Sequence, residues 1–221
     1  MKKQSFSGSV AVGVFSVALV CVAVAFATPS WLASDWRITS TNLNKIGLWT
    51  HCYKSLPDPA AADAPTQFFV GCRWIYDPFT AGWSDIREFL IPPFMIITQL
   101  FFTICFVLML IAFALVIFFT TCLDPEHRRF VQLIYSIGFI LIVAGVSGAI
   151  GVIVFACLAN GKGWMPDHEN NYFSWSFALG VIGSVLCIIA GGLFLVEASV
   201  QKKKRRYLKE SQTRFQLESK S

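Results

Sequence analysis

The sequence predicts an integral membrane protein, an all-α bundle of four transmembrane helices that carries a small antiparallel β-sheet in its first extracellular loop. Three observations predict this fold class. The 221 residues are 55% hydrophobic and 14% charged, whereas soluble domains carry about 25% charged residues. The apolar residues gather into four long runs. Two cysteines stand in strand-like segments of the longest polar loop.

The four apolar runs predict transmembrane segments at 8–28, 91–120, 130–158 and 173–197. Each is long enough to cross a hydrocarbon core, which takes roughly 20 helical residues. No charged residue occurs in them before Glu197, so each backbone is best satisfied as a helix. Gln99 is the most polar side chain deep within a span, and we expect it to make a helix–helix hydrogen bond or to line a pathway.

The first run also has a second interpretation, as a secretory signal peptide. Lys2 and Lys3 precede it, and Ala25-Phe26-Ala27 has the small-x-small shape of a cleavage site. The run is longer than the apolar region of a typical signal peptide, and Pro29 and two tryptophans follow it. These features favour a retained anchor.

The distribution of basic residues predicts that both termini are cytoplasmic. Twelve of the 18 Lys and Arg residues then lie in the N-terminus 1–7, the turn 121–129 and the basic tail 198–221, in agreement with the positive-inside bias. The extracellular loops are 29–90 and 159–172, and every tryptophan falls in them or at an outer helix end. The net charge of +5 is therefore the sum of +7 on the cytoplasmic side (12 basic and 5 acidic residues) and −2 on the extracellular side (6 basic and 8 acidic residues). The basic cytoplasmic face indicates contact with membrane lipids and no nucleic acid.

The large loop predicts short strands at 37–40, 46–53 and 67–76, with a proline-rich loop at 56–65 between the last two. Cys52 and Cys72 are the two cysteines that fall outside the membrane and the cytoplasm. We expect them to form a disulfide in this oxidising compartment. Two free thiols, or metal ligation together with His51, remain as alternatives, although no further ligands with zinc spacing occur.

The loop also carries a recognisable pattern of residues. Trp31 follows the first span, Gly47-Leu48-Trp49 precedes Cys52, and Cys72 comes later. This order resembles the signature of claudins and of the wider claudin/PMP22/EMP superfamily. Arg87 is similar to the arginine that ends the first extracellular segment of claudins. The resemblance covers the whole chain, and the wide cysteine spacing looks more like the divergent arthropod claudins of septate junctions.

The resemblance implies a cell–cell junction protein that binds itself and other claudin-like proteins, in cis and in trans, at lateral contacts of an epithelium. It places Leu48 beneath the sheet and Trp49 at the bilayer edge, although Trp49 is also interpretable as a plain core aromatic. It makes Arg73 a candidate for ion selectivity in a paracellular pore, as an alternative to a barrier. Further candidates are Trp164 and Met165 as trans contacts or interfacial anchors, and Cys122 as a palmitoylated or unmodified thiol.

Other function classes remain open. The same architecture occurs in auxiliary subunits of ion channels or receptors, such as calcium-channel gamma relatives, and in myelin-type or epithelial membrane proteins that act in trafficking. The last residues, 217–221, lack the terminal apolar side chain of a PDZ ligand. No paired carboxylates, nucleophile–base group or histidine cluster is visible in the sequence, so we expect no catalytic residues, no metal and no cofactor.

Overall fold

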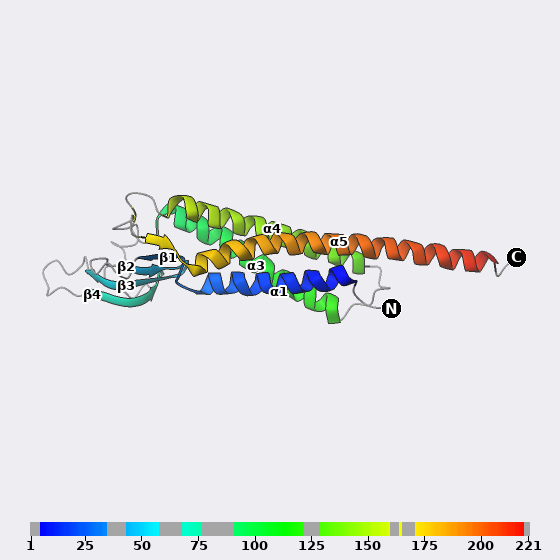
Figure 1. The fold of residues 1–221 in the computed structure, drawn as a ribbon, viewed down its shortest axis with the longest axis horizontal. Coiled ribbons are helices and arrows are strands. Elements are labelled where there is room, and N and C mark those ends of the chain that lie inside the picture. Colours follow the sequence, from blue (N-terminus) through cyan, green and yellow to red (C-terminus); the bar gives the residue numbers. More distant parts are fainter. Residues whose placement is uncertain are drawn as a thin grey trace.

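A computed structural model describes residues 5–34, 43–57, 68–76, 91–121, 129–159, 164 and 171–218. Four long helices form a bundle, with the sheet at one end and both termini at the other (Figure 1). They are α1 (Phe6–Ala27), α3 (Pro93–Thr121), α4 (Phe130–Leu158) and α5 (Trp175–Glu218). Each contains an apolar stretch long enough to cross a membrane. The predicted four-helix membrane fold is confirmed.

Close packing of α4 against α5 depends on glycines. A Cβ at Gly145 would lie 2.5 Å from Cγ1 of Ile188 and 2.9 Å from the carbonyl oxygen of Ser184. A Cβ at Gly191 would likewise lie 2.8 Å from the carbonyl oxygen of Gly138. Small residues at these positions bring the two helix backbones together, which is the usual source of association between apolar helices in lipid.

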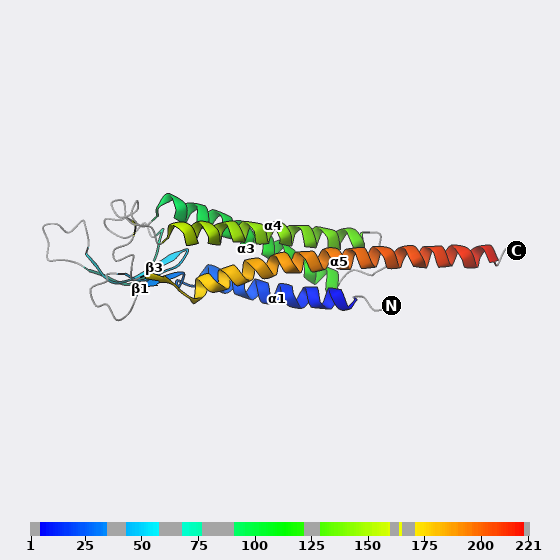
Figure 2. The ribbon, with the colours of Figure 1, turned by 45° about the horizontal axis from the view of Figure 1, so that its top comes forward.

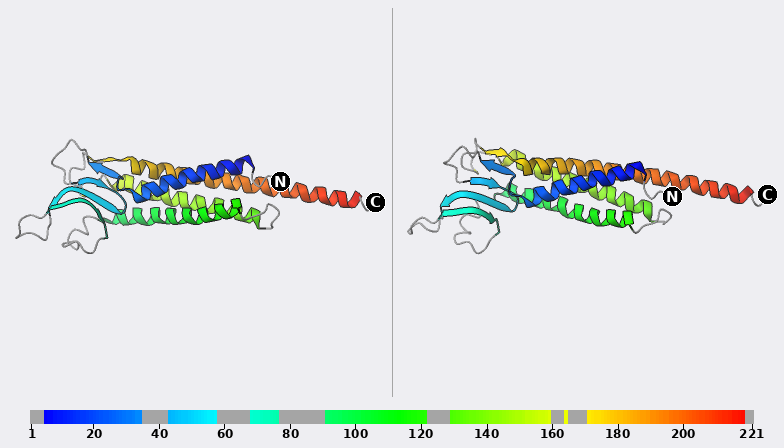
Figure 3. Two further views of the ribbon diagram at one scale, coloured as in Figure 1. Left: turned by 90° about the horizontal axis from the view of Figure 1, so that it is seen from below. Right: turned by 60° about the horizontal axis from the view of Figure 1, so that its bottom comes forward.

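The sheet has five antiparallel strands in the order β4-β3-β2-β1-β5. Four come from the segment between α1 and α3: β1 (Leu32–Ser34), β2 (Leu43–Ile46), β3 (Thr50–Pro57) and β4 (Phe68–Trp74). The fifth, β5 (Asn171–Phe173), comes from the segment between α4 and α5 and pairs with β1. Figure 3 shows the strands standing beyond the same end of the bundle in two further views.

The structure corrects three boundaries. The strand predicted at 46–53 is two strands, because residues 47–49 turn the chain between β2 and β3. The fourth span was expected to begin at 173, whereas this residue belongs to β5 and the helix begins at Trp175. Leu56 and Pro57, both expected in the loop, end β3. Because β3 pairs with β2 only as far as Tyr53, Pro57 lies on an edge of the described sheet, where proline is tolerated. The strand predicted at 37–40 and most of the proline-rich loop lie outside the described residues.

Helix α5 does not end with the membrane segment at 197. It continues as one helix to Glu218 and extends well beyond the end of the bundle at which α4 begins (Figure 2). The sequence after 197 contains no glycine or proline and is rich in Lys, Arg, Glu and Gln, which are good helix formers. The basic tail therefore projects as a helix from the bundle.

The buried core is continuous from the helices into the base of the sheet. Trp31, Leu32, Ile46 and Leu48 are fully buried and belong to the same apolar cluster as the inward faces of all four helices. A small sheet has little core of its own. Its stability and its orientation must therefore come from the contacts it makes with the bundle.

Candidate functional site

The candidate site is the junction between sheet and bundle, and Trp31 lies at its centre. The side chain is fully buried, and its indole N–H donates a 2.7 Å hydrogen bond to the carbonyl oxygen of Ala25 in α1. Its ring meets Phe102 of α3, Phe155 of α4 and Phe177 of α5 edge-on, at centroid distances of 5.0, 5.1 and 5.7 Å. One indole thus contacts all four helices, in the geometry that aromatic pairs prefer.

The turn between β2 and β3 comes unusually close to the end of α1. The Gly47 N–H donates a 2.9 Å hydrogen bond to the Thr50 carbonyl, which closes the turn. A Cβ at position 47 would lie 2.5 Å from Cα of Pro29 and 2.8 Å from the carbonyl oxygen of Thr28. Both are backbone atoms, so a neighbouring rotamer change cannot make room. Glycine is therefore required by the approach of two backbones.

The tip of this turn is fastened to α3 by Gln99. The Gln99 side-chain amide donates a 2.6 Å hydrogen bond to the carbonyl oxygen of Leu48, and its own oxygen accepts a 3.0 Å bond from the Tyr76 hydroxyl. Gln99 is 3% exposed and Leu48 is fully buried. The prediction of a helix–helix hydrogen bond was therefore wrong: the most polar side chain of the spans binds the sheet, because the turn reaches down to the end of the bundle.

Trp49, the last residue of the turn, is half-buried. Its ring packs against Phe26 near the end of α1, at 5.4 Å between centroids, and against Tyr76, at 6.3 Å. Its buried indole nitrogen has no hydrogen-bond partner among the described residues. The arrangement contains features of both interpretations of Trp49: the ring is packed on aromatic neighbours and part of it stays exposed beside the helix end.

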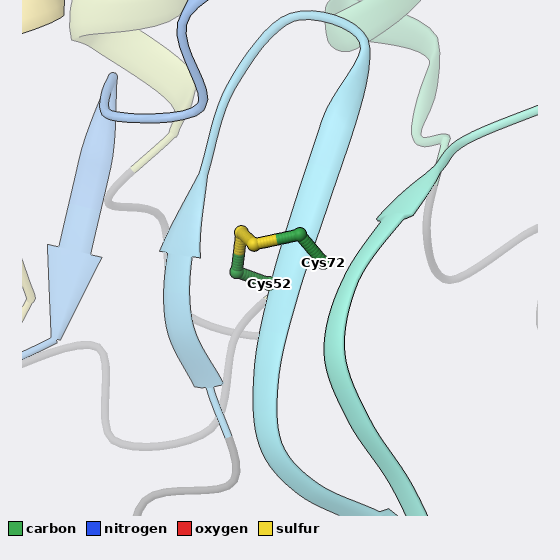
Figure 4. The surroundings of a disulfide bond; sticks show 2 residues. All are labelled: Cys52 and Cys72. Atoms are coloured by element: carbon green, nitrogen blue, oxygen red, sulfur yellow. A yellow bond between two sulfur atoms is a disulfide. The ribbon is translucent and has the colours of Figure 1, made fainter.

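The disulfide between Cys52 and Cys72 is confirmed, and it joins adjacent strands at paired positions of β3 and β4 (Figure 4). The alternatives of free thiols and of metal ligation are thereby excluded for these two cysteines. Closing a loop of this length contributes about 3 kcal/mol by limiting the unfolded chain. The bond fixes β4 to the strand that begins at the anchored turn.

These features can be compared with known proteins. A family model described as PMP-22/EMP/MP20/Claudin tight junction matches residues 3–196, which include all of α1, α3 and α4 and the start of α5. The chain belongs to the PMP-22/EMP/MP20/claudin family. Comparison with individual curated proteins gives no match. The predicted membership of the claudin superfamily is confirmed, whereas the likeness to arthropod septate-junction claudins stays a prediction. Family membership points to a structural membrane protein rather than an enzyme.

Among the other claudin-type residues expected from the sequence, Arg73 lies on β4, exposed and paired in register with His51 of β3. Trp164 is only 8% exposed, and its ring meets Phe94 edge-on at 4.9 Å. Its indole is thus packed inside this claudin-family chain, and its role as a trans contact stays a prediction. The three remaining candidates, Arg87, Cys122 and Met165, lie outside the described residues.

His51 is buried inside the sheet of this family member. It is 2% exposed, and its Nδ1 lies 3.3 Å from the Tyr53 hydroxyl. Burial disfavours the charged imidazolium and lowers the pKa of His51 from 6.5 to about 3. Burial also raises the pKa of Tyr53. Both side chains are therefore neutral at physiological pH, and the exposed charge at this level of the sheet comes from Arg73.

Sequence reasoning missed a polar cluster at the opposite end of the bundle. Glu197 of α5 is fully buried. Its carboxylate accepts hydrogen bonds from the hydroxyls of Ser5 and Ser7, from the Ser5 N–H at 3.3 Å and from the Gln201 amide at 2.8 Å. A Cβ at Gly8 would lie 3.0 Å from this carboxylate, so glycine leaves it room. An acidic residue directly after an apolar run was the signal, because such a group needs a partner.

Proposed function

We propose that this protein is a cell–cell junction protein of the claudin type. It oligomerises within one membrane and between apposed membranes, and it forms or maintains the paracellular diffusion barrier of a tight or septate junction. In this proposal both termini and the helical tail are cytoplasmic, and the sheet stands in the intercellular gap at lateral contacts. Its partners are further copies of itself and other claudin-like proteins.

The observation that carries the proposal is the rigid mounting of a sheet whose two outer strands each pair on one side only, among the residues that the structure describes. Trp31, Gly47 and Gln99 hold the base of the sheet against the helix ends. The outer strands are β4 and β5. A fixed orientation relative to the membrane allows many copies to align in rows, which a freely moving loop does not allow.

Both edges also carry exposed apolar side chains. On β4, Val70 is 68% exposed and Trp74 is 56% exposed; on β5, Tyr172 is 51% exposed. Unpaired strand edges with apolar side chains favour association with another chain. These edges therefore support lateral assembly. Trp164 and Met165 in the second loop are proposed to contribute to trans contacts, and Cys122 is proposed as a lipidation site.

A second candidate function is a charge-selective paracellular pore. Arg73 is exposed on the same outer strand, β4, as Val70 and Trp74. A cationic side chain facing a narrow gap repels cations, and the effect is largest where water is confined. The barrier and the pore would be built from the same rows of copies. They differ in whether neighbouring copies leave a passage for ions beside Arg73.

The proposal is tested by expressing the tagged protein in cells that lack junction strands. We expect it to concentrate where two expressing cells meet, and not where an expressing cell meets a non-expressing one. Val70→Lys, which places a charge on the outer strand, should abolish this enrichment while surface delivery persists. Ser211→Lys, an exposed site on the tail, is the matched control. Uniform surface distribution of the wild-type protein would contradict trans assembly.

A further inference from the structure

A cleft of about 440 Å³ is lined by residues from the beginning of α4 and from the basic part of α5. Figure 2 shows these two helix segments at the end of the bundle opposite the sheet, where α5 continues past the bundle. The volume of the cleft is many times the roughly 30 Å³ that one water occupies in the liquid. Its lining residues are Val131, Gln132, Tyr135, Lys202, Arg205, Arg206 and Lys209.

The cleft gathers four cations from one helix. Lys202, Arg205, Arg206 and Lys209 are spaced at i, i+3, i+4 and i+7, which places them on one face of α5. Lys203 and Lys204 belong to the same basic run but do not line the cleft. Helix geometry thus divides one basic run into a set that converges on α4 and a set that does not.

The α4 side of the cleft holds one of these cations, Arg205, and adds two polar side chains. The Arg205 guanidinium lies 5.6 Å from the centroid of the Phe130 ring, within the range of a cation–π contact. Gln132 and Tyr135 add an amide and a hydroxyl that can bind phosphate oxygens. The Tyr135 hydroxyl lies 3.4 Å from the hydroxyl of Ser199, which keeps this side chain against α5.

Neither Glu197 nor Glu210, the acidic residues of α5 nearest to the basic run, lines the cleft. Glu197 is buried and hydrogen-bonded to Ser5, Ser7 and Gln201. Glu210 lines a separate hollow on the tail. Within the described part of the chain, the lining of the cleft is therefore basic and polar, with Val131 as its apolar member.

The level of the cleft along the helices matters as well. Phe130 begins the apolar stretch of α4, and the basic run of α5 begins directly after the apolar residues that end at Val200 and the buried Gln201. The cleft thus lies where hydrocarbon gives way to headgroups. A basic pocket between membrane helices at this level is the usual form of a site for a phosphorylated lipid headgroup.

We propose that this cleft binds the headgroup of a polyphosphorylated inositol lipid from the inner leaflet. Four convergent cations match a headgroup that carries several phosphate charges, whereas a lipid with a single negative charge leaves most of them unmatched. The assignment to the inner leaflet rests on the proposed orientation of the termini. The binding itself depends on neither the orientation nor the junction role.

The test uses the purified full-length protein in nanodiscs that expose both leaflets. Binding of fluorescent phosphatidylinositol 4,5-bisphosphate is measured against phosphatidylserine discs of equal total charge. We expect at least tenfold preference for the inositol lipid. The double variant Lys202→Gln/Arg206→Gln should weaken binding by about tenfold or more, because it removes two of the four cations that attract the lipid phosphates. The matched variant Lys203→Gln/Lys204→Gln should change it less than about twofold.

Equal losses in the two double variants would overturn the proposal, because they would indicate general surface electrostatics. Equal binding to phosphatidylserine discs would overturn it also. Soluble inositol trisphosphate serves as a competitor, and binding as tight as that of the lipid would reassign the cleft to a free phosphate ligand. A protease added outside intact cells tests the orientation separately. Cleavage of the tail would show that the tail is extracellular, which is a different result from failed lipid binding.

Discussion

The side-chain amide of Gln99 donates a 2.6 Å hydrogen bond to the backbone carbonyl of Leu48. The donor belongs to a membrane helix and the acceptor to the tip of a β-turn, 51 positions earlier in the chain. This bond, together with the Tyr76 hydroxyl on the amide oxygen, ties the sheet to α3. The sheet therefore cannot tilt without breaking a buried polar contact.

Gln99→Leu should loosen this connection. The substitution leaves the Leu48 carbonyl and the Tyr76 hydroxyl without their partner, at a cost of about 1–3 kcal/mol. We expect a lower thermal unfolding midpoint in detergent and reduced surface delivery. Tyr76→Phe removes only one of the two hydrogen bonds and should have a smaller effect. Unchanged stability of Gln99→Leu would show that the contact does not hold the sheet.

Gly47→Ala should destabilise the turn through backbone overlap. The added methyl group would lie 2.5 Å from Cα of Pro29, and overpacking of this kind costs about 1–3 kcal/mol. Gly192→Ala is the control, since a Cβ there meets nothing within 4 Å. The measurement is the fraction of protein that reaches the cell surface with the Cys52–Cys72 bond formed. Equal fractions for the two variants would contradict the close approach.

The Glu197 cluster predicts a second point of weakness at the other end of the bundle. Glu197→Leu removes the acceptor for Ser5, Ser7 and Gln201 and should cost about 1.5–3 kcal/mol, the range for hydrogen bonds to a charged group. Glu197→Gln should cost less, because its amide oxygen still accepts. Glu210→Gln, on the exposed tail, serves as the control. The thermal unfolding midpoint in detergent should be lowest for Glu197→Leu, higher for Glu197→Gln and highest for Glu210→Gln. Any other order would contradict a stabilising role for the Glu197 hydrogen bonds.

His51 should make the sheet sensitive to acid. Its pKa is about 3 in the folded protein and about 6.5 in an unfolded chain. The unfolded state therefore takes up a proton first, so stability falls as the pH drops below about 6.5, by about 2 kcal/mol at pH 5. His51→Phe should remove this dependence. Unfolding midpoints at pH 7.5 and pH 5 are compared; an equal drop in both proteins would rule His51 out as the cause.

Arg73→Asp tests the pore as distinct from the barrier. If a passage runs beside Arg73, reversing its charge should shift the dilution potential of a cell layer toward cation preference. Arg214→Asp, on the exposed tail, changes the net charge equally and should leave the potential unchanged. An unchanged dilution potential with Arg73→Asp would end the pore proposal and leave the barrier proposal intact.

Features governed by local rules could be predicted from the sequence. The four spans follow from the length of apolar sequence that a bilayer requires. The Cys52–Cys72 bond follows from counting which cysteines face an oxidising compartment. The motif around Gly47 and Trp49 pointed to the family that the match over residues 3–196 establishes.

Features governed by long-range contacts could not be predicted in this way. Strand β5 has three residues, too few for an alternating pattern, and it exists because β1 offers a free edge. The partner of Gln99 depends on how far the turn reaches toward the helices. The helical continuation past 197 was visible in residue preference, but a charged tail alone does not indicate whether its residues converge on a neighbouring helix.

A sheet held in a fixed position on the bundle should maintain a barrier between cells. The most direct test depletes the protein from a polarised epithelium that expresses it and follows a fluorescent dextran across the layer. We predict faster paracellular leak, restored by the wild-type chain and not by Gln99→Leu, with the protein located at lateral contacts. An unchanged dextran flux after complete depletion would contradict a barrier role and favour an auxiliary channel subunit.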